Sequence, residues 1–321
     1  MSPELRWQRA CRLTLALGLV LALAVAGYMT LGAVGKWSFV LSYRGEKLLT
    51  ILLVAWTVPA ATVLFHVISR NPILTPSIMG FDTLFVLIQT LAVFLLGSAT
   101  VSAWPPQLVF LGELAVMVVF ASLLFHWLFS RIAQSLELLL LVGIVFGVLF
   151  RSVSGLLQRL IDPSEFLIVQ DRMFASFSGA EPQVLTMSAG LVGVATLWAI
   201  WRLPAIDAMV LGRDAALAIG VPHRRLTAEV FLIVTLLVAA STALVGPITF
   251  FGLLVANVAY RLLPGAPLRL TLPLAGLLGA ALLVAAQVVL ERVLGFAGTV
   301  GIVIEFLGGL IFILLLIERA R

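Results

Sequence analysis

Two carboxylates, Glu113 and Glu305, lie inside long apolar stretches of the sequence. Because an ionised side chain at membrane depth is costly, such a group normally faces other protein or a water-filled path. The two residues could relay protons or other cations, as in a proton-coupled carrier, or each could be a protonated or hydrogen-bonded group that ties helices together. Both are expected nearer the outer face than the midplane, which favours the structural interpretation. Asp82 is expected near the membrane interface.

Histidine chemistry is the other possibility. His66 and His126 lie near the ends of apolar segments, but a catalytic metal needs about three protein ligands, and neither has an H-x-x-x-H or E-x-x-H partner nearby. The sequence contains no G-x-S-x-G nucleophile elbow and no G-x-x-x-x-G-K-[ST] phosphate loop. We therefore predict no catalytic residue, no metal ligand and no cofactor on this chain. If ATP drives the protein, another chain must bind it.

The composition indicates which elements position these residues. The chain has 321 residues, of which 62% are hydrophobic and 11% are charged, far from the values of soluble domains. It contains no basic cluster interleaved with aromatic residues, so nucleic-acid binding is not expected. We predict an all-α polytopic membrane protein in which residues 1–321 form one transmembrane domain.

About ten membrane segments are predicted from the apolar runs. They lie at about 13–34, 48–69, 78–97, 108–130, 136–157, 183–203, 228–246, 250–262, 270–290 and 299–317. The first run superficially resembles a signal peptide, but its length and the spans behind it favour an uncleaved segment. With the N-terminus in the cytoplasm, 13 of the 20 Lys and Arg residues fall on the cytoplasmic side, as the positive-inside rule requires. Both termini are therefore expected in the cytoplasm.

One uncharged run is too long for a single crossing. Residues 230–260 span 31 positions, with Gly246 and Pro247 midway. One straight helix of that length would measure roughly 46 Å, against about 30 Å for a hydrocarbon core. Since proline removes a backbone donor and clashes with the preceding turn, we predict a break here, followed by a short second segment. A broken membrane helix needs protein or water around its unpaired backbone, which is typical of a transport path.

The loop at about 202–227 is long and has an unusual pattern. Residues 205–211 and 214–219 are predicted to form two short helices, ended by Gly212 and Gly220. Its apolar residues include Ile206, Met209, Val210 and Leu217. A loop in water does not normally keep such residues unless a partner covers them, although a helix lying on the lipid surface is an alternative.

Three blocks of the sequence carry a family resemblance. Residues 70–80 read RNPILTPSIMG and are similar to R-N-P-L-A-x-P-x-x-L-G, and residues 211–221 read LGRDAALAIGV and are similar to L-G-x-x-x-A-x-x-L-G-V. Residues 246–257 read GPITFFGLLVAN and are similar to G-P-I-x-F-x-G-L-x-x-P-H. Together they resemble FecCD-type permeases, the membrane subunits of ABC importers for iron-siderophores, haem and vitamin B12. Order and spacing agree over nearly the whole chain, and ten spans is the family's count.

The chain departs from the family pattern at several positions. Where many members carry R-x-P-R, this chain has Arg44-Gly-Glu-Lys47. His66 stands where the family usually has a glutamine, and Ala256-Asn257 stands where it has the P-H pair. These departures resemble the branch that imports ferric siderophores of catecholate or mixed type. Haem and vitamin B12 remain alternative cargoes within the family.

The resemblance implies a bacterial inner-membrane location and several partners. These would be a second permease (a heterodimer is favoured over a homodimer), two cytoplasmic ATPase subunits that bind ATP and Mg, and a periplasmic or lipid-anchored substrate-binding protein. Segments 5 and 8 would line a central path.

The resemblance also assigns candidate site residues. The ATPase-coupling residues would be Ile206, Met209, Leu211, Gly212, Asp214, Leu217, Gly220 and Val221. The cytoplasmic gate would be Asn71, Ile73 and Ser135, and the binding-protein docking residues would be Arg44, Lys47 and Arg292. The helix break would be formed by Gly246, Pro247 and Gly252.

Overall fold

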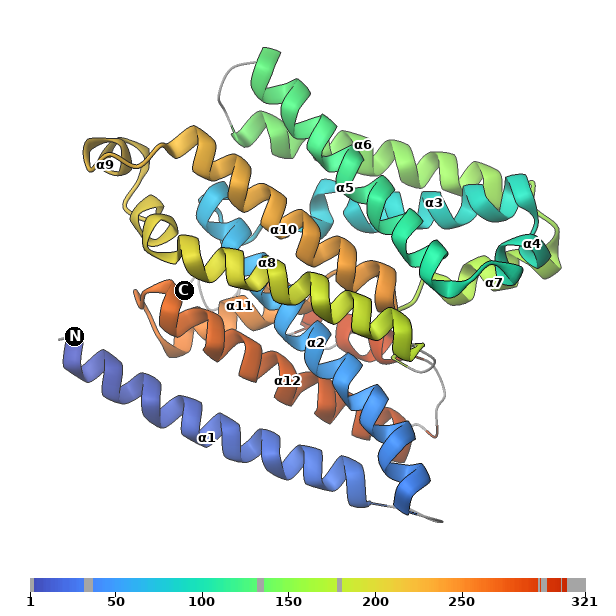
Figure 1. Cartoon of the computed structure of the whole chain (residues 1–321), viewed down its shortest axis with the longest axis horizontal. Coiled ribbons are helices and arrows are strands. Elements are labelled where there is room, and N and C mark those ends of the chain that lie inside the picture. Colours follow the sequence, from blue (N-terminus) through green and yellow to red (C-terminus); the bar gives the residue numbers. More distant parts are fainter. Residues whose placement is uncertain are drawn as a thin grey trace.

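The computed structural model describes residues 3–31, 37–131, 136–177, 181–293, 295, 299–306 and 308–310. Their side chains are described except at positions 3–6, 39, 126–131 and 136–140. Throughout these ranges the regular structure is helical (Figure 1). The predicted all-α fold is therefore confirmed for the described part of the chain.

Twelve α-helices and one 3-10 helix follow one another along the described chain. They are α1 (Pro3–Thr30), α2 (Trp37–Ser69), η1 (Pro76–Met79), α3 (Phe81–Leu96), α4 (Ser98–Ala103), α5 (Pro106–Arg131), α6 (Leu136–Gln158), α7 (Pro163–Arg172), α8 (Pro182–Met209), α9 (Arg213–Ala218), α10 (His223–Val245), α11 (Phe251–Leu262) and α12 (Leu268–Arg292). A last helical stretch covers 300–306 and 308–310.

Seven of the described helices are long and apolar enough to cross a membrane: α1, α2, α5, α6, α8, α10 and α12. Each coincides with one predicted segment. The other three predicted segments fall on shorter apolar helices, namely α3, α11 and the stretch around 300–310. α1 begins at the same end of the bundle as α9, while α4 and α7 lie at the opposite end (Figure 1). The number of crossings and the side of each terminus stay predictions.

α2 and α10 form the centre of the bundle, and α1 lies at its rim beside α12 (Figure 1). Glycines allow the central helices to approach closely. A Cβ on Gly279 of α12 would lie 2.6 Å from the Ala55 carbonyl oxygen of α2, and a Cβ on Gly252 of α11 would overlap the Thr62 side chain. Helices in a membrane associate without a hydrophobic driving force, so small residues at a crossing stabilise it by letting the two backbones pack closely. Gly252 therefore packs α11 against α2.

The predicted helix break is confirmed at Gly246 and Pro247, whereas Gly252, the third predicted break residue, lies inside α11. α10 ends at Val245, Gly246 has φ +95°, and α11 begins only at Phe251. With 12 residues, α11 is roughly 18 Å long, well short of a full crossing. The segment before α8 covers the break, because the Ser176 N–H donates to the Val245 carbonyl at 2.8 Å.

The inner loop differs from its prediction in one respect. Residues 205–211 do not form a separate helix, because α8 continues through Pro204 to Met209. Ile206 and Met209 are fully buried there. Their packing offsets the cost of the helical hydrogen bond that is lost because Pro204 has no backbone N–H. The second short helix is confirmed as α9.

Candidate coupling, gate and docking sites

Residues 210–221, which we call the coupling segment, present an apolar surface at one end of the bundle. Leu211 is 70% exposed and Leu217 is 49% exposed, although both are large apolar residues. The segment is held in shape by its own backbone, since Ala216 N–H donates to the Gly212 carbonyl at 3.0 Å and Val221 N–H to the Ala216 carbonyl at 2.9 Å. It is a compact apolar projection with few contacts to the bundle.

Both glycines of the coupling segment have the conformation that the pattern predicted. Gly212 has φ +107° and Gly220 has φ +84°, values that residues with a Cβ rarely adopt. Gly212 precedes α9, and Gly220 follows it. Exchange of either glycine would strain the turn that orients α9.

Six of the eight predicted coupling residues lie in this segment: Leu211, Gly212, Asp214, Leu217, Gly220 and Val221. The other two, Ile206 and Met209, are 0% and 1% exposed within this chain's own core. The expectation that they need a partner to cover them is wrong, because α8 extends further than predicted and turns them inward.

The turn at 70–76, which we call the gate turn, is rigid and tied to the helix after the break. Asn71 accepts a hydrogen bond from the Ile73 N–H through its Oδ1 at 3.0 Å, which forms a local Asx turn. Asn257 of α11 donates from Nδ2 to the Pro72 carbonyl at 3.1 Å and to the Leu253 carbonyl at 2.9 Å. Ile73 is exposed. The third predicted gate residue, Ser135, lies outside the described residues.

A hollow of about 800 Å³ separates the gate turn from the coupling segment. Its wall includes Pro72, Leu211 and the buried His66, whose Nδ1 lies 3.0 Å from the Tyr260 hydroxyl. In the described part of the chain, no group of three or more His, Cys, Asp and Glu residues could hold a metal ion. The side chain of His126 lies outside the described residues.

The two intramembrane glutamates occupy separate places. Glu113 is buried and accepts a hydrogen bond from Gln89 Nε2, and Gln89 Oε1 in turn accepts one from Arg172 Nη1 at 2.8 Å. This chain of contacts ties α5 to α3 and to the end of α7. Glu305 instead lies near Asp82.

Asp82, which was expected near the membrane interface, is buried within the protein. Its Oδ2 accepts a hydrogen bond from Thr249 Oγ1 at 2.9 Å. Thr249 belongs to the non-helical stretch between α10 and α11. Asp82 therefore binds the start of α3 to the helix break, a contact that the sequence did not indicate.

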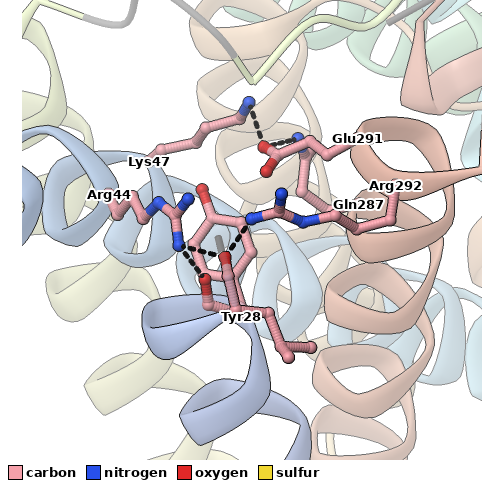
Figure 2. Close-up of polar contacts among 7 residues, drawn as sticks. Tyr28, Arg44, Lys47, Gln287, Glu291 and Arg292 are labelled. Carbon is pink, nitrogen blue, oxygen red and sulfur yellow. Dashed lines mark hydrogen bonds and ion pairs between the residues drawn. The ribbon is translucent and has the colours of Figure 1, made fainter. Parts of the chain in front are cut away.

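The three predicted docking residues come together where α1, α2 and α12 meet (Figure 2). Arg44 Nη1 donates to the carbonyls of Tyr28 at 2.7 Å and Leu31 at 3.0 Å, so it caps the end of α1. Arg292 Nη2 donates to the same Leu31 carbonyl. Two of the three basic side chains thus tie α1 to its neighbours.

Lys47 does not present its charge to solvent. It is 6% exposed, and its Nζ lies 3.0 Å from Glu291 Oε1, to which Gln287 also donates at 2.6 Å (Figure 2). The expectation that Lys47 offers an exposed charge to a binding protein is wrong, because a carboxylate on α12 neutralises it within the chain. Arg292 is the exposed member of the cluster.

The comparison with known families decides the identity of the fold. A family model described as the FecCD transport family matches residues 13–318. The chain belongs to the FecCD transport family. The resemblance carried by the three sequence blocks is therefore confirmed, and this is a family of membrane transport proteins rather than of enzymes.

Relatives of this FecCD chain match it over nearly their full length. The petrobactin import system permease protein YclO of Bacillus subtilis is 36% identical over 311 residues, covering 97% of this chain and 98% of that protein. The petrobactin import system permease protein FatC of Bacillus anthracis is 31% identical, covering 95% and 87%. The vitamin B12 import system permease protein BtuC of Vibrio cholerae is 30% identical, covering 98% and 95%.

A solved structure shares the FecCD fold seen here. It is described as an inward-facing conformation of a metal-chelate type ABC transporter, and it aligns with a TM-score of 0.80 over 96% of this chain and 99% of that chain. The sequence identity is 21%, so the likeness concerns the fold. The two chains therefore share one fold over nearly their whole length.

Proposed function

We propose that this FecCD-family chain is the membrane-spanning permease subunit of an ABC importer that brings a ferric siderophore into the cytoplasm. The observation that carries this proposal is the coupling segment. It exposes Leu217 on the glycine-bounded helix α9 and Leu211 just before Gly212, an apolar surface that suits contact with a partner protein. The two petrobactin permeases among the relatives support the choice of cargo.

In this mechanism two ATPase subunits bind ATP and Mg in the cytoplasm, and the coupling segment of this chain inserts into a groove of one of them. Their closure moves α9 relative to the bundle, and the hollow beside it leaves room for that movement. The end of α8 transmits the movement, because Asp207 Oδ1 accepts a hydrogen bond from the Leu268 N–H at the start of α12 at 2.8 Å. The gate turn then moves together with α11, to which Asn257 ties it, and cytoplasmic access opens or closes.

The remaining partners are a second permease and an outer binding protein, in the cytoplasmic membrane of a bacterium. A second permease would cover the exposed face of α6 and enclose the path. The binding protein would approach the opposite end from α9, where Arg292 is the exposed basic residue beside Arg44. Exposed charge pairs of this kind contribute little affinity each and mainly set orientation and encounter rate.

Reconstitution of the purified complex tests this proposal. The chain is co-expressed with a candidate second permease and a candidate ATPase, placed in vesicles, and supplied with binding protein and ⁵⁵Fe-labelled ferric petrobactin. We expect uptake that requires ATP on the ATPase side. Uphill uptake by the isolated chain without an ATPase would overturn the proposal, and competition by haem or vitamin B12 would reassign the cargo.

The proton-coupled alternative finds no support in the geometry. Glu113 is hydrogen-bonded through Gln89 to Arg172, whereas Glu305 belongs to a different cluster around Asp82. A relay needs groups that can pass a proton from one to the next, and these two lie in separate networks. Conversion of either to glutamine is expected to leave ATP-driven uptake in place.

A further inference from the structure

α6 lies at the rim of the bundle, where α3 and η1 cover one of its sides (Figure 1). Its other side is exposed and mostly apolar. The exposed residues are Leu141, Ile144, Val145, Val148, Leu149, Arg151, Ser152 and Leu156, and Arg159 follows just after the helix ends. The apolar part of this face suits the contact with the second permease proposed above, whereas its end carries Arg151, with Arg159 just beyond the helix.

An open hollow of about 760 Å³ lies at this end of α6. Its lining includes Arg151 and Arg159, with Ser152 and Gln158 as further polar groups and Phe166 of α7 at one side. Gly155 lies between the arginines, and a Cβ there would meet no atom within 4 Å, so the space above it is open.

The charge of this hollow is of one sign. No carboxylate is among its lining residues, and among the described residues neither arginine has a carboxylate within ion-pair distance. Arg151 lies seven positions before the end of α6, roughly 10 Å along its axis. Because an arginine facing lipid at such a position is costly, this part of α6 must face water or an anionic group.

We propose that this hollow is an anion site at the outer mouth of the path, where the guanidinium groups of Arg151 and Arg159 hold a negatively charged ferric chelate. The inference rests on the proposed function and adds to it the charge of the cargo. The planar guanidinium matches pairs of anionic oxygens, such as the carboxylate or catecholate oxygens of a chelate. The volume suits a ligand of drug-like size, and the open, water-facing position keeps the attraction weak enough for release.

A phosphate of a lipid headgroup offers the same oxygen chemistry, so the experiment separates the two sources. The complete importer is reconstituted in vesicles of phosphatidylcholine alone and in vesicles that also contain phosphatidylglycerol. Initial uptake of ⁵⁵Fe-labelled ferric petrobactin is measured below saturation for wild type, R151Q, R159Q, R151Q/R159Q and R151K/R159K. The matched control is R12Q, which removes one exposed positive charge from α1.

In phosphatidylcholine vesicles we expect R151Q/R159Q to lower uptake on the order of tenfold, because steering by local charge is worth at least that much. R151K/R159K should keep most of the uptake, R12Q should match wild type, and added salt should reduce uptake by wild type more than by the double variant. Uptake by the double variant within twofold of wild type would overturn the proposal.

Two further outcomes also count against the anion site. If the double variant is impaired only when phosphatidylglycerol is present, the hollow binds lipid; if it no longer copurifies with the second permease, the arginines belong to that interface. Equilibrium dialysis of ferric petrobactin against the chain in phosphatidylcholine nanodiscs adds a readout that does not depend on import. Salt-sensitive binding that is lost in R151Q/R159Q supports the site. Failure of the wild type to import would refute only the proposed function. Equal binding by wild type and R151Q/R159Q refutes the site.

Discussion

The side-chain amide of Asn257 donates a hydrogen bond to the backbone carbonyl of Pro72 at 3.1 Å. These residues are 185 positions apart, yet the contact joins the short helix after the break to the gate turn. Any displacement of α11 is therefore transmitted to the turn that carries Asn71 and Ile73. Because the same amide also binds the Leu253 carbonyl within α11, its orientation is fixed from both sides.

Removal of this amide should loosen the gate. Asn257→Ala loses the donor, and Asn257→Asp keeps the size of the side chain but cannot donate to the carbonyl. A hydrogen bond of this kind contributes about 1 kcal/mol, which corresponds to about a fivefold shift in a two-state equilibrium. We expect leak of ferric chelate from loaded vesicles without ATP to rise by about that factor in both variants. Vesicles as tight as those with wild type would show that the contact does not hold the gate.

The coupling segment should bind the ATPase through its exposed apolar side chains. Leu217→Ser removes one of them without disturbing the core, since the residue is half exposed in this chain. We expect less ATPase to copurify, with thermal stability of the permease within about 0.5 kcal/mol of wild type, as for other surface changes. Ala215→Ser on the same helix is the matched control and should retain the ATPase. Equal retention by both variants would argue that α9 is not the contact.

The Lys47–Glu291 pair should contribute to stability rather than to docking. Lys47→Met leaves the Glu291 carboxylate without this partner at a site where both side chains are nearly buried. Loss of one member of a buried pair costs about 3 kcal/mol, whereas replacement of both by apolar residues is often close to neutral. We expect a clearly lower melting temperature for Lys47→Met in detergent and substantial recovery in Lys47→Met/Glu291→Leu. Full stability of the single variant would contradict this role.

Some features could be predicted because they depend on a few neighbouring residues. The break at Gly246-Pro247 follows from backbone rules alone, and the glycines that bound α9 follow from the conformation a short helix needs at its ends. The family blocks contain these same positions. Local chemistry and the resemblance therefore indicated the same places.

Other features depend on which helices pack together and could not be predicted. Pro204 suggested the end of a segment, but α8 continues because Ile206 and Met209 find a core on the neighbouring helices. Lys47 and Glu291 lie 244 positions apart, so no local pattern shows that the charge of one is neutralised by the other. The same holds for the contact between Asn257 and Pro72.

The crossing of α2 and α12 offers a final test of the packing at the centre of the bundle. Gly279 leaves no room for a methyl group, because its Cβ would lie 2.6 Å from the Ala55 carbonyl oxygen and 3.1 Å from Phe251. The nearest atom is backbone, so Gly279→Ala must separate the helices, at a cost of about 1–3 kcal/mol for overpacking. Gly190 on α8 has no atom within 4 Å of the same position and has an ordinary helical backbone. Gly190→Ala should therefore be neutral or stabilise by about 0.5 kcal/mol, since alanine restricts the unfolded chain more than glycine does. Thermal unfolding of both variants in detergent would compare them directly, and equal melting temperatures would mean that α2 and α12 are less closely packed than described.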